Sequence, residues 1–162
     1  MPISGRFARV VALMAPVLVA SASAVVSAQI LDKKVLSLAA ARKVAAAAQE
    51  AARVKGVDVV IVVVDDGGYI LLLERMDGAQ VASVNVGIGK ARTAAIYRRP
   101  SKVFEDQIKN GRIAALALAD ATPLQGGVPI LLDGKVIGAI GISGDSPQID
   151  EDIAFAGAAA FK

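Results

Sequence analysis

The fold of this chain is decided by the stretch Val57-Asp58-Val59-Val60-Ile61-Val62-Val63-Val64-Asp65-Asp66-Gly67-Gly68. Residues 57–64 are nearly all β-branched, which is typical of a strand that is covered on both faces. The two aspartates and two glycines that follow suit the positive φ angles of a tight turn, and residues 69–75 return as the partner strand. We therefore predict a β-hairpin over residues 57–75.

A second hairpin is predicted over residues 128–143, because Asp133-Gly134 joins a strand at 128–132 to a strand at 135–143. Helices are predicted before, between and after the two hairpins. Their ranges are Leu38–Lys55 with Ser37 as N-cap and Gly56 at its end, Gln80–Arg98 ended by Pro100, Ser101–Asn110 ended by Gly111, and a last helix opened by Ser146-Pro147. The order α-β-β-α-α-β-β-α predicts an α+β domain, layered, with a largely antiparallel sheet.

The first 28 residues have the pattern of a secretory signal peptide. Arg6 and Arg9 precede an apolar run over residues 10–20, and Val26-Ser27-Ala28 offers small side chains at a cleavage site. A membrane anchor is disfavoured, because this run of 11 residues cannot cross about 30 Å of hydrocarbon. We expect cleavage before Gln29 and export to the periplasm or the extracellular space.

Composition limits the function of the mature chain. Removing the leader leaves 16 basic and 15 acidic residues, a net charge of +1, with no basic stripe for nucleic acid and no stable membrane span. The remaining 134 residues, 29–162, fit one domain. The chain has no cysteine and no histidine, which excludes disulfides, thiolate metal sites and Ser-His or Cys-His dyads.

Short polar and glycine-marked blocks follow one another in a fixed order. They are Val63-Val64-Asp65-Asp66-Gly67-Gly68, Arg75-Met76-Asp77-Gly78-Ala79, Lys90-Ala91-Arg92-Thr93-Ala94, Gly126-Gly127-Val128-Pro129-Ile130, Ile137-Gly138-Ala139-Ile140-Gly141-Ile142-Ser143-Gly144 and Asp150-Glu151-Asp152. In this order the blocks resemble the GlcG/HbpS-like haem-binding family, which is related to the C-terminal domain of PduO-type adenosyltransferases. The resemblance covers residues 36–161.

For residues 113–127 the sequence predicts a short helical turn followed by a loop. The resemblance implies a five-stranded sheet with packed helices, a profilin-like layout, and the segment 113–118 is our candidate for the fifth strand. It also implies a homo-oligomer, and haem as a bound cofactor. The small residues in the last strand and in the last helix fit either tight helix-on-sheet packing or a subunit interface.

The blocks also supply candidate ligand-binding residues. Lys90 and Thr93 share a helix face and offer a cation and a hydroxyl, and the resemblance implies that this block lies near a ligand cleft. Arg75 either grips an acidic ligand that Asp77 orients, or the two residues pair or cap the next helix. The candidate set, expected to wall one cavity beside the sheet, is Arg75, Asp77, Lys90, Thr93, Gly126, Gly127, Gly141 and Ser143.

Other readings of the same blocks are weaker. Val84 stands where a P-loop needs its first glycine and Ala91 where it needs Ser or Thr, and the glycines after residue 137 lack dinucleotide-binding spacing. Met76 is either an axial haem ligand or, more commonly, a core filler. The acids at 150–152 suit the helix dipole better than a hard-cation site, so no metal site is predicted.

Departures from the family leave three readings of the function open. Without histidine, the iron ligands of a haem reduce to Tyr69, Tyr97, Met76, a lysine, a carboxylate or a hydroxyl. The acidic pair of some iron-binding members is replaced by Asn85 and Ile88. The first hypothesis is an exported haem-, tetrapyrrole- or small-ligand-binding protein. The alternative is an enzyme or sensor for a small organic acid, and a third reading is an oligomeric scaffold.

Overall fold

Four strands form one antiparallel sheet in the order β2-β1-β4-β3. A computed structural model describes residues 32–161, and all its elements lie in the unit Lys33–Lys162. The strands are β1 (Val60–Asp65), β2 (Ile70–Arg75), β3 (Gly127–Leu132) and β4 (Lys135–Ser143). Both predicted hairpins are confirmed, and β1 pairs with β4 from Val60↔Ser143 to Asp65↔Gly138, which joins them into one sheet.

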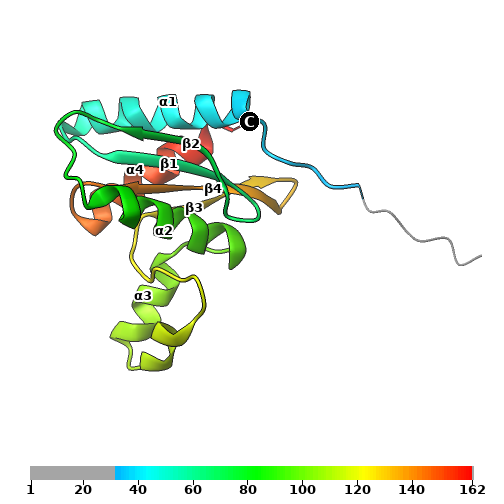
Figure 1. The fold of residues 1–162 in the computed structure, drawn as a ribbon, viewed down its shortest axis with the longest axis vertical. Coiled ribbons are helices and arrows are strands. Elements are labelled where there is room, and N and C mark those ends of the chain that lie inside the picture. Colours follow the sequence, from blue (N-terminus) through cyan, green and yellow to red (C-terminus); the bar gives the residue numbers. More distant parts are fainter. Residues whose placement is uncertain (1–31, 162) are drawn as a thin grey trace, which may run out of the picture. The chain divides into compact units, whose positions relative to one another are not determined.

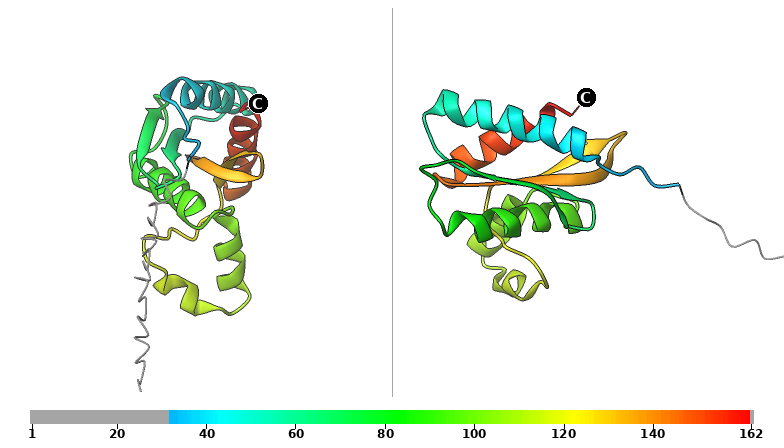
Figure 2. Two further views of the ribbon diagram at one scale, coloured as in Figure 1. Left: turned by 90° about the vertical axis from the view of Figure 1, so that its right-hand side faces the viewer. Right: turned by 45° about the horizontal axis from the view of Figure 1, so that its top comes forward.

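Helices cover both faces of this sheet. They are α1 (Leu38–Lys55), α2 (Ser83–Ile96), α3 (Lys102–Lys109) and α4 (Pro147–Ala159). Helices α1 and α4 pack on one face, and α2 packs on the other with α3 beyond it (Figures 1 and 2). The predicted caps are confirmed, since the Ser37 and Ser146 hydroxyls accept hydrogen bonds from the first turns of α1 and α4. Among the described helices, none combines the length and the apolar run that a bilayer crossing needs.

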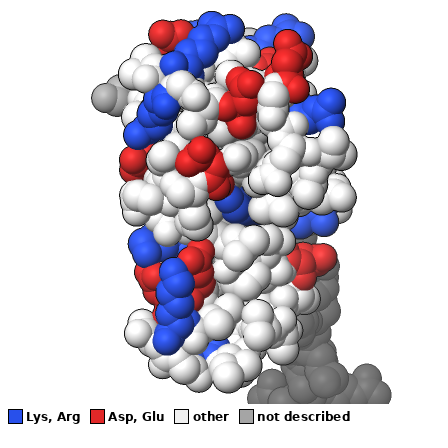
Figure 3. All heavy atoms as spheres, turned by 90° about the vertical axis from the view of Figure 1, so that its left-hand side faces the viewer, with Lys and Arg blue, Asp and Glu red and all other residues white. Residues whose placement is uncertain are grey.

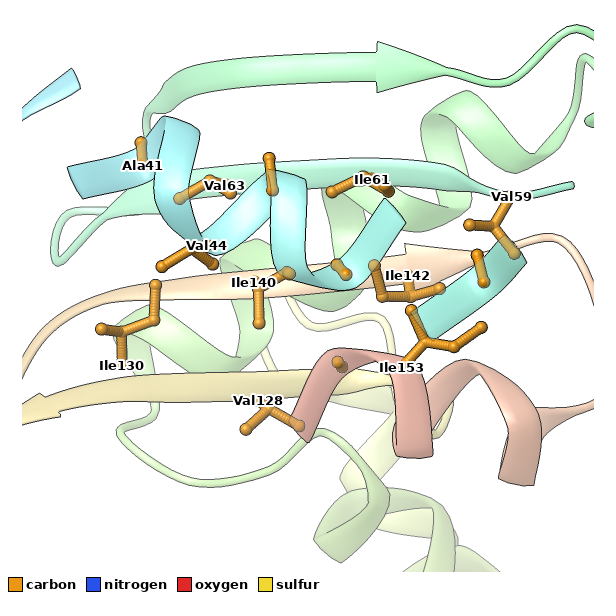
Figure 4. Close-up of a cluster of buried hydrophobic side chains, with 14 of the residues drawn as sticks. Ala41, Val44, Val59, Ile61, Val63, Val128, Ile130, Ile140, Ile142 and Ile153 are labelled. Atoms are coloured by element: carbon orange, nitrogen blue, oxygen red, sulfur yellow. The ribbon is translucent and has the colours of Figure 1, made fainter. Parts of the chain in front are cut away.

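Strand β1 is the centre of the core. Alternate side chains point to opposite faces of a strand, so Ile61 and Val63 contact α1 and its neighbours, whereas Val60, Val62 and Val64 contact α2. Figure 4 shows the first of these clusters, with Val44 and Ile153 closing it from the helices. Residues 60–64 are all fully buried, as the unbroken β-branched sequence predicts.

The candidate fifth strand is wrong, whereas the short helical turn predicted for the same segment is confirmed. Residues Ile113–Ala117 form a short 3₁₀ helix, η1, in the connection between α3 and β3. Its Ile113 and Leu116 side chains are 66% and 61% exposed, and only Ala115 is buried. The segment therefore lacks the alternating buried face that docking onto a sheet edge requires. The second helix is also shorter than predicted, because residues 80–82 form a turn before Ser83.

Helix α2 approaches the sheet unusually closely where β4 has a glycine. A methyl group added to Gly141 would lie 2.3 Å from the Gly87 carbonyl oxygen and 2.5 Å from the Ala91 amide nitrogen. Both atoms belong to the backbone of α2, so neither can move independently of the helix. Gly141 therefore serves close packing between α2 and β4, which fixes the height of α2 above the sheet.

This contact predicts that Gly141→Ala lowers the free energy of unfolding by about 1–3 kcal/mol, because overpacking displaces α2. Gly67→Ala is the matched control, since its added methyl would meet only side-chain atoms at 3.3 Å or more. Urea unfolding followed by circular dichroism measures both. Equal losses in the two variants would contradict a specific α2–β4 contact.

Candidate functional site

A pocket of about 350 Å³ lies where α2 and α4 begin, beside the end of β4. Helix α3 and the loop before β3 complete its wall. Its principal polar lining residues are Ser83, Lys90, Glu105, Gln125, Ser143 and Asp150. Figure 3 looks onto this end of α2 and α4, where acidic and basic side chains are mixed and no patch of a single sign forms.

A buried ion pair forms the floor of this pocket. The Lys90 ammonium lies 2.7 Å from a carboxylate oxygen of Asp150, and the two side chains are 5% and 3% exposed. Lys90 also donates a hydrogen bond of 2.9 Å to the Ile142 carbonyl, and the second Asp150 oxygen accepts one from the Asp145 amide. Helix α2, strand β4 and helix α4 therefore meet at one lysine.

Burial of this ion pair changes the pKa of Asp150. Desolvation raises the pKa of Asp150 above its ordinary value, and the hydrogen bond and charge of Lys90 oppose the rise without cancelling it. Ionising Asp150 in the folded protein thus costs more than ionising it in water. The pair is held by the fold rather than being a large source of stability.

Two successive glycines allow the loop before β3 to reach this ion pair. A methyl group on Gly126 would lie 3.0 Å from the Lys90 Nζ atom and 2.9 Å from the Ile142 carbonyl oxygen. One on Gly127 would overlap the Lys90 carbonyl oxygen at 2.1 Å. Gly126 also has a φ of 121°, which strains any other residue. Both predicted glycines therefore shape the pocket through the backbone.

Gln125 links the same loop to helices α3 and α4. Its amide N–H donates to Glu105 on α3, and its side chain donates to Glu151 on α4 at 2.7 Å. Burial alone would raise the pKa of Glu105, but hydrogen bonds from Lys109 and from the Gln125 amide outweigh it and the pKa is lowered. Glu105 therefore stays ionised at the rim.

Thr93 lies one turn beyond Lys90 and has a different contact. Its hydroxyl donates to the Gly89 carbonyl and accepts from the Thr122 amide, both at 2.7 Å. Thr93 is fully buried and lies outside the pocket lining. It fastens the segment 118–126 to α2, so its observed contacts hold the pocket wall.

Arg75 and Asp77 lie apart from these residues. Both are exposed at the end of β2, and neither lines the two pockets described. Met76 between them packs against the core. Of the predicted set, the structure brings together Lys90, Ser143, Gly126 and Gly127, places Gly141 under α2 and Thr93 behind the pocket, and leaves Arg75 and Asp77 outside.

The acids of the last block point to separate partners. Asp150 pairs with Lys90, Glu151 accepts from Gln125, and Asp152 pairs with Lys55 at 3.2 Å. Within residues 32–161, no three His, Cys, Asp or Glu side chains form a group suited to a metal ion. The expectation that Asp150 serves chiefly the helix dipole is incomplete, because its carboxylate is the counter-ion of a buried lysine.

A second, smaller hollow of about 200 Å³ lies near the other end of α2. It is lined by Gly67, Tyr69, Arg92, Ile96 and Asp120. Asp65 accepts hydrogen bonds of 2.9 Å from the Gly67 and Tyr69 amides, which confirms its predicted role in the turn. The turn presents Tyr69 with 70% of its surface exposed.

Comparison with known proteins agrees with the order of the blocks. A family model described as haem degrading protein HbpS-like matches residues 36–159. The chain belongs to the HbpS-like family. The protein GlcG of Escherichia coli K12 is 42% identical to this HbpS-like chain over 111 residues, which is 68% of this chain and 83% of GlcG.

Two solved structures resemble this HbpS-like domain closely. The crystal structure of HbpS has a TM-score of 0.77 at 32% identity and covers 84% of this chain and 96% of its own. The crystal structure of a PduOC:heme complex has a TM-score of 0.71 at 30% identity, with 78% of this chain and 95% of the other covered.

Sequence reasoning missed several lining residues of this HbpS-like domain. Ser83 and Gln125 carry no local signal, because their importance comes from the approach of distant segments. Asp150 had an indirect signal: a lysine predicted on a helix that packs against a sheet needs a counter-ion, and the acids at 150–152 were available.

The ion pair predicts unequal effects of removing its two members. Lys90→Met strands a buried carboxylate and should lower the free energy of unfolding by about 3 kcal/mol near pH 7. Asp150→Asn leaves the Lys90 ammonium without a counter-ion, but the ammonium keeps its hydrogen bond to the Ile142 carbonyl and can donate to the new amide oxygen, so we expect a smaller loss, about 1–2 kcal/mol.

The pH dependence follows from the raised pKa of Asp150. The folded state keeps this proton at pH values where the unfolded chain has lost it, so stability falls as pH rises above about 3.8, the ordinary value. The loss in Lys90→Met should therefore be smaller at pH 5 than at pH 7. Urea titrations at both values measure it, and an equal, pH-independent loss in both variants would contradict the assignment.

Proposed function

We propose that this protein binds haem. The observation that carries the proposal is the likeness to the PduOC:heme complex at 30% identity, together with the haem-related description of the matching family model. Haem would supply an iron centre that a side chain of this protein ligates.

The Lys90 pocket does not fit a haem. Its 350 Å³ is at the low end of the range for ligand pockets, about 300–1,000 Å³, and its wall is rich in charged and polar groups. A flat apolar macrocycle needs apolar or aromatic walls. The neighbouring aromatic residue Phe104 does not supply such a wall. It is buried, and its ring packs edge-to-face against Tyr97 with a centroid distance of 5.0 Å.

Tyr69 is the side chain best placed to ligate iron. The hydroxyl of Tyr97 donates a 2.6 Å hydrogen bond to the Ala119 carbonyl, and Met76 packs against the core. The Tyr69 phenol is exposed beside the hollow that Arg92 lines. Arginine pairs well with carboxylates, so Arg92 suits a haem propionate. The hollow of about 200 Å³ is itself too small to enclose a haem, so the macrocycle would lie across the exposed surface, with Tyr69 at the iron and Arg92 at a propionate.

The two tyrosines of the chain provide a matched test. Titration of the full chain with hemin should give a saturable change in the Soret band, and Tyr69→Phe should weaken binding at least tenfold because it removes the iron ligand. Tyr97→Phe removes a phenol of the same kind from a position where it serves structure, so its Soret titration should match that of the parent protein.

Two results would contradict this proposal in different ways. The absence of a saturable Soret change at micromolar protein would contradict haem binding itself. Unchanged hemin affinity of the Tyr69→Phe variant would be consistent with haem binding but would contradict Tyr69 as the iron ligand.

We also propose that the protein is exported and self-associates. The leader pattern supports export, although residues 1–28 lie outside the described residues. Exposed apolar side chains on α4 and η1, such as Phe155 at 49% and Leu116, support a contact between copies. The exported fraction should contain a chain beginning at Gln29 by intact-mass measurement, and light scattering should give a multiple of that mass. A full-length chain in that fraction would contradict export with cleavage before Gln29. The mass of a single chain in light scattering would contradict self-association.

A further inference from the structure

We propose that the Lys90 pocket binds a small uncharged compound that carries at least two hydroxyl groups. This inference does not rest on haem binding, because it concerns the other end of α2 and a different set of residues. It follows from two unpartnered hydroxyls, from the charge balance of the wall and from the size of the pocket.

Two largely buried serines line this pocket, and their hydroxyls have no partner within the described residues. Ser83 is 2% and Ser143 is 5% exposed, and both line the pocket. Neither side chain makes a hydrogen bond with another residue in the described range 32–161, and neither is sealed from the cavity. Both hydroxyl oxygens are therefore accessible from the pocket, where each can donate to and accept from a ligand or the water that a ligand displaces.

The Lys90 ammonium adds a third donor. An ammonium has three N–H groups, of which one is used by Asp150 and one by the Ile142 carbonyl. The remaining N–H belongs to a residue that lines the pocket. Two hydroxyls that each donate and accept, with one further donor, match the hydrogen bonds of a polyol.

The charge of the wall argues against an anion. Lys90 is the one base among the lining residues, and Asp150 already neutralises it. Glu105 and Asp145 are further acids of the same wall, although Glu105 is paired with Lys109 at 2.5 Å. A carboxylate ligand would lose its hydration without meeting an unpaired cation, which is unfavourable.

The start of α2 does not supply the missing positive charge. A free helix N-terminus can bind an anion through its amides. Here the Ser83 amide donates to the Gln80 carbonyl at 3.1 Å and the Val84 amide donates to the Val81 carbonyl at 3.2 Å. These two amides are already used, so the start of α2 does not favour an anion.

Glycerol and glycerate provide a matched pair of probes, because they differ mainly in the replacement of a hydroxymethyl group by a carboxylate. Binding to the full chain is followed by the methyl resonances of Val86 and Leu124, which line the pocket. We expect glycerol to shift both with a dissociation constant on the order of 1 mM, the range open to roughly six non-hydrogen atoms, and glycerate to bind at least tenfold more weakly.

Variants test the individual contacts. Ser83→Ala and Ser143→Ala should each weaken glycerol binding about two- to tenfold, the effect of one hydrogen bond. Ser37→Ala is the matched control, because it removes the α1 cap, lowers stability and leaves the pocket intact. Asp150→Asn removes one negative charge from the wall and should shift the preference toward glycerate.

Three results would overturn the proposal. Glycerate binding as tightly as glycerol would assign the pocket to an organic acid. Absence of any shift with either probe would leave the pocket without the proposed ligand class. Shifts that persist unchanged in both serine variants would place the binding elsewhere.

Discussion

The contact between the backbone of α2 and that of β4 is the constraint on which the candidate site depends. At Gly141 no side chain separates the two elements, so Gly87 and Ala91 of the helix lie directly on the strand. This sets the height of α2 and carries Lys90 to the end of β4, where its ammonium reaches the Ile142 carbonyl and Asp150. A side chain at Gly141 would raise the helix, and a raised helix would withdraw the lysine from its partners.

Placing an ion pair in this position has a cost that the surrounding fold must offset. Desolvation dominates at Asp150, which is why its pKa is raised despite the nearby ammonium. The apolar contacts of β1 with both helix layers are extensive enough to hold the pair in place.

The parts that could be predicted from sequence are those governed by neighbours along the chain. The strand in the β-branched run at 57–64, the Asp65 turn and the serine caps depend on patterns within a few residues, and all were predicted. The ion pair joins residues 60 positions apart, and no local pattern specifies it. The failed prediction of a strand at residues 113–118 has a similar origin. Its apolar composition allowed a strand, but the course of the connection after α3 left it exposed and helical. Arg75 was grouped with Lys90 by motif order, whereas the hairpin geometry places the end of β2 outside both pockets.

The pocket beside Lys90 and the hollow beside Tyr69 are both lined by residues of α2 and of the segment 118–126. Residues 118–126 contribute Asp120 to the hollow beside Tyr69 and Gln125 to the pocket beside Lys90. Between them Thr122 is fastened to Thr93, and Gly89 leaves room for it, since a methyl there would lie 2.1 Å from the Thr122 hydroxyl. The fastening point therefore lies between the hollow beside Tyr69 and the polar pocket beside Lys90. This hydrogen bond runs from a backbone amide to a fully buried hydroxyl, so Thr93 fixes the course of the segment that supplies residues to both pockets.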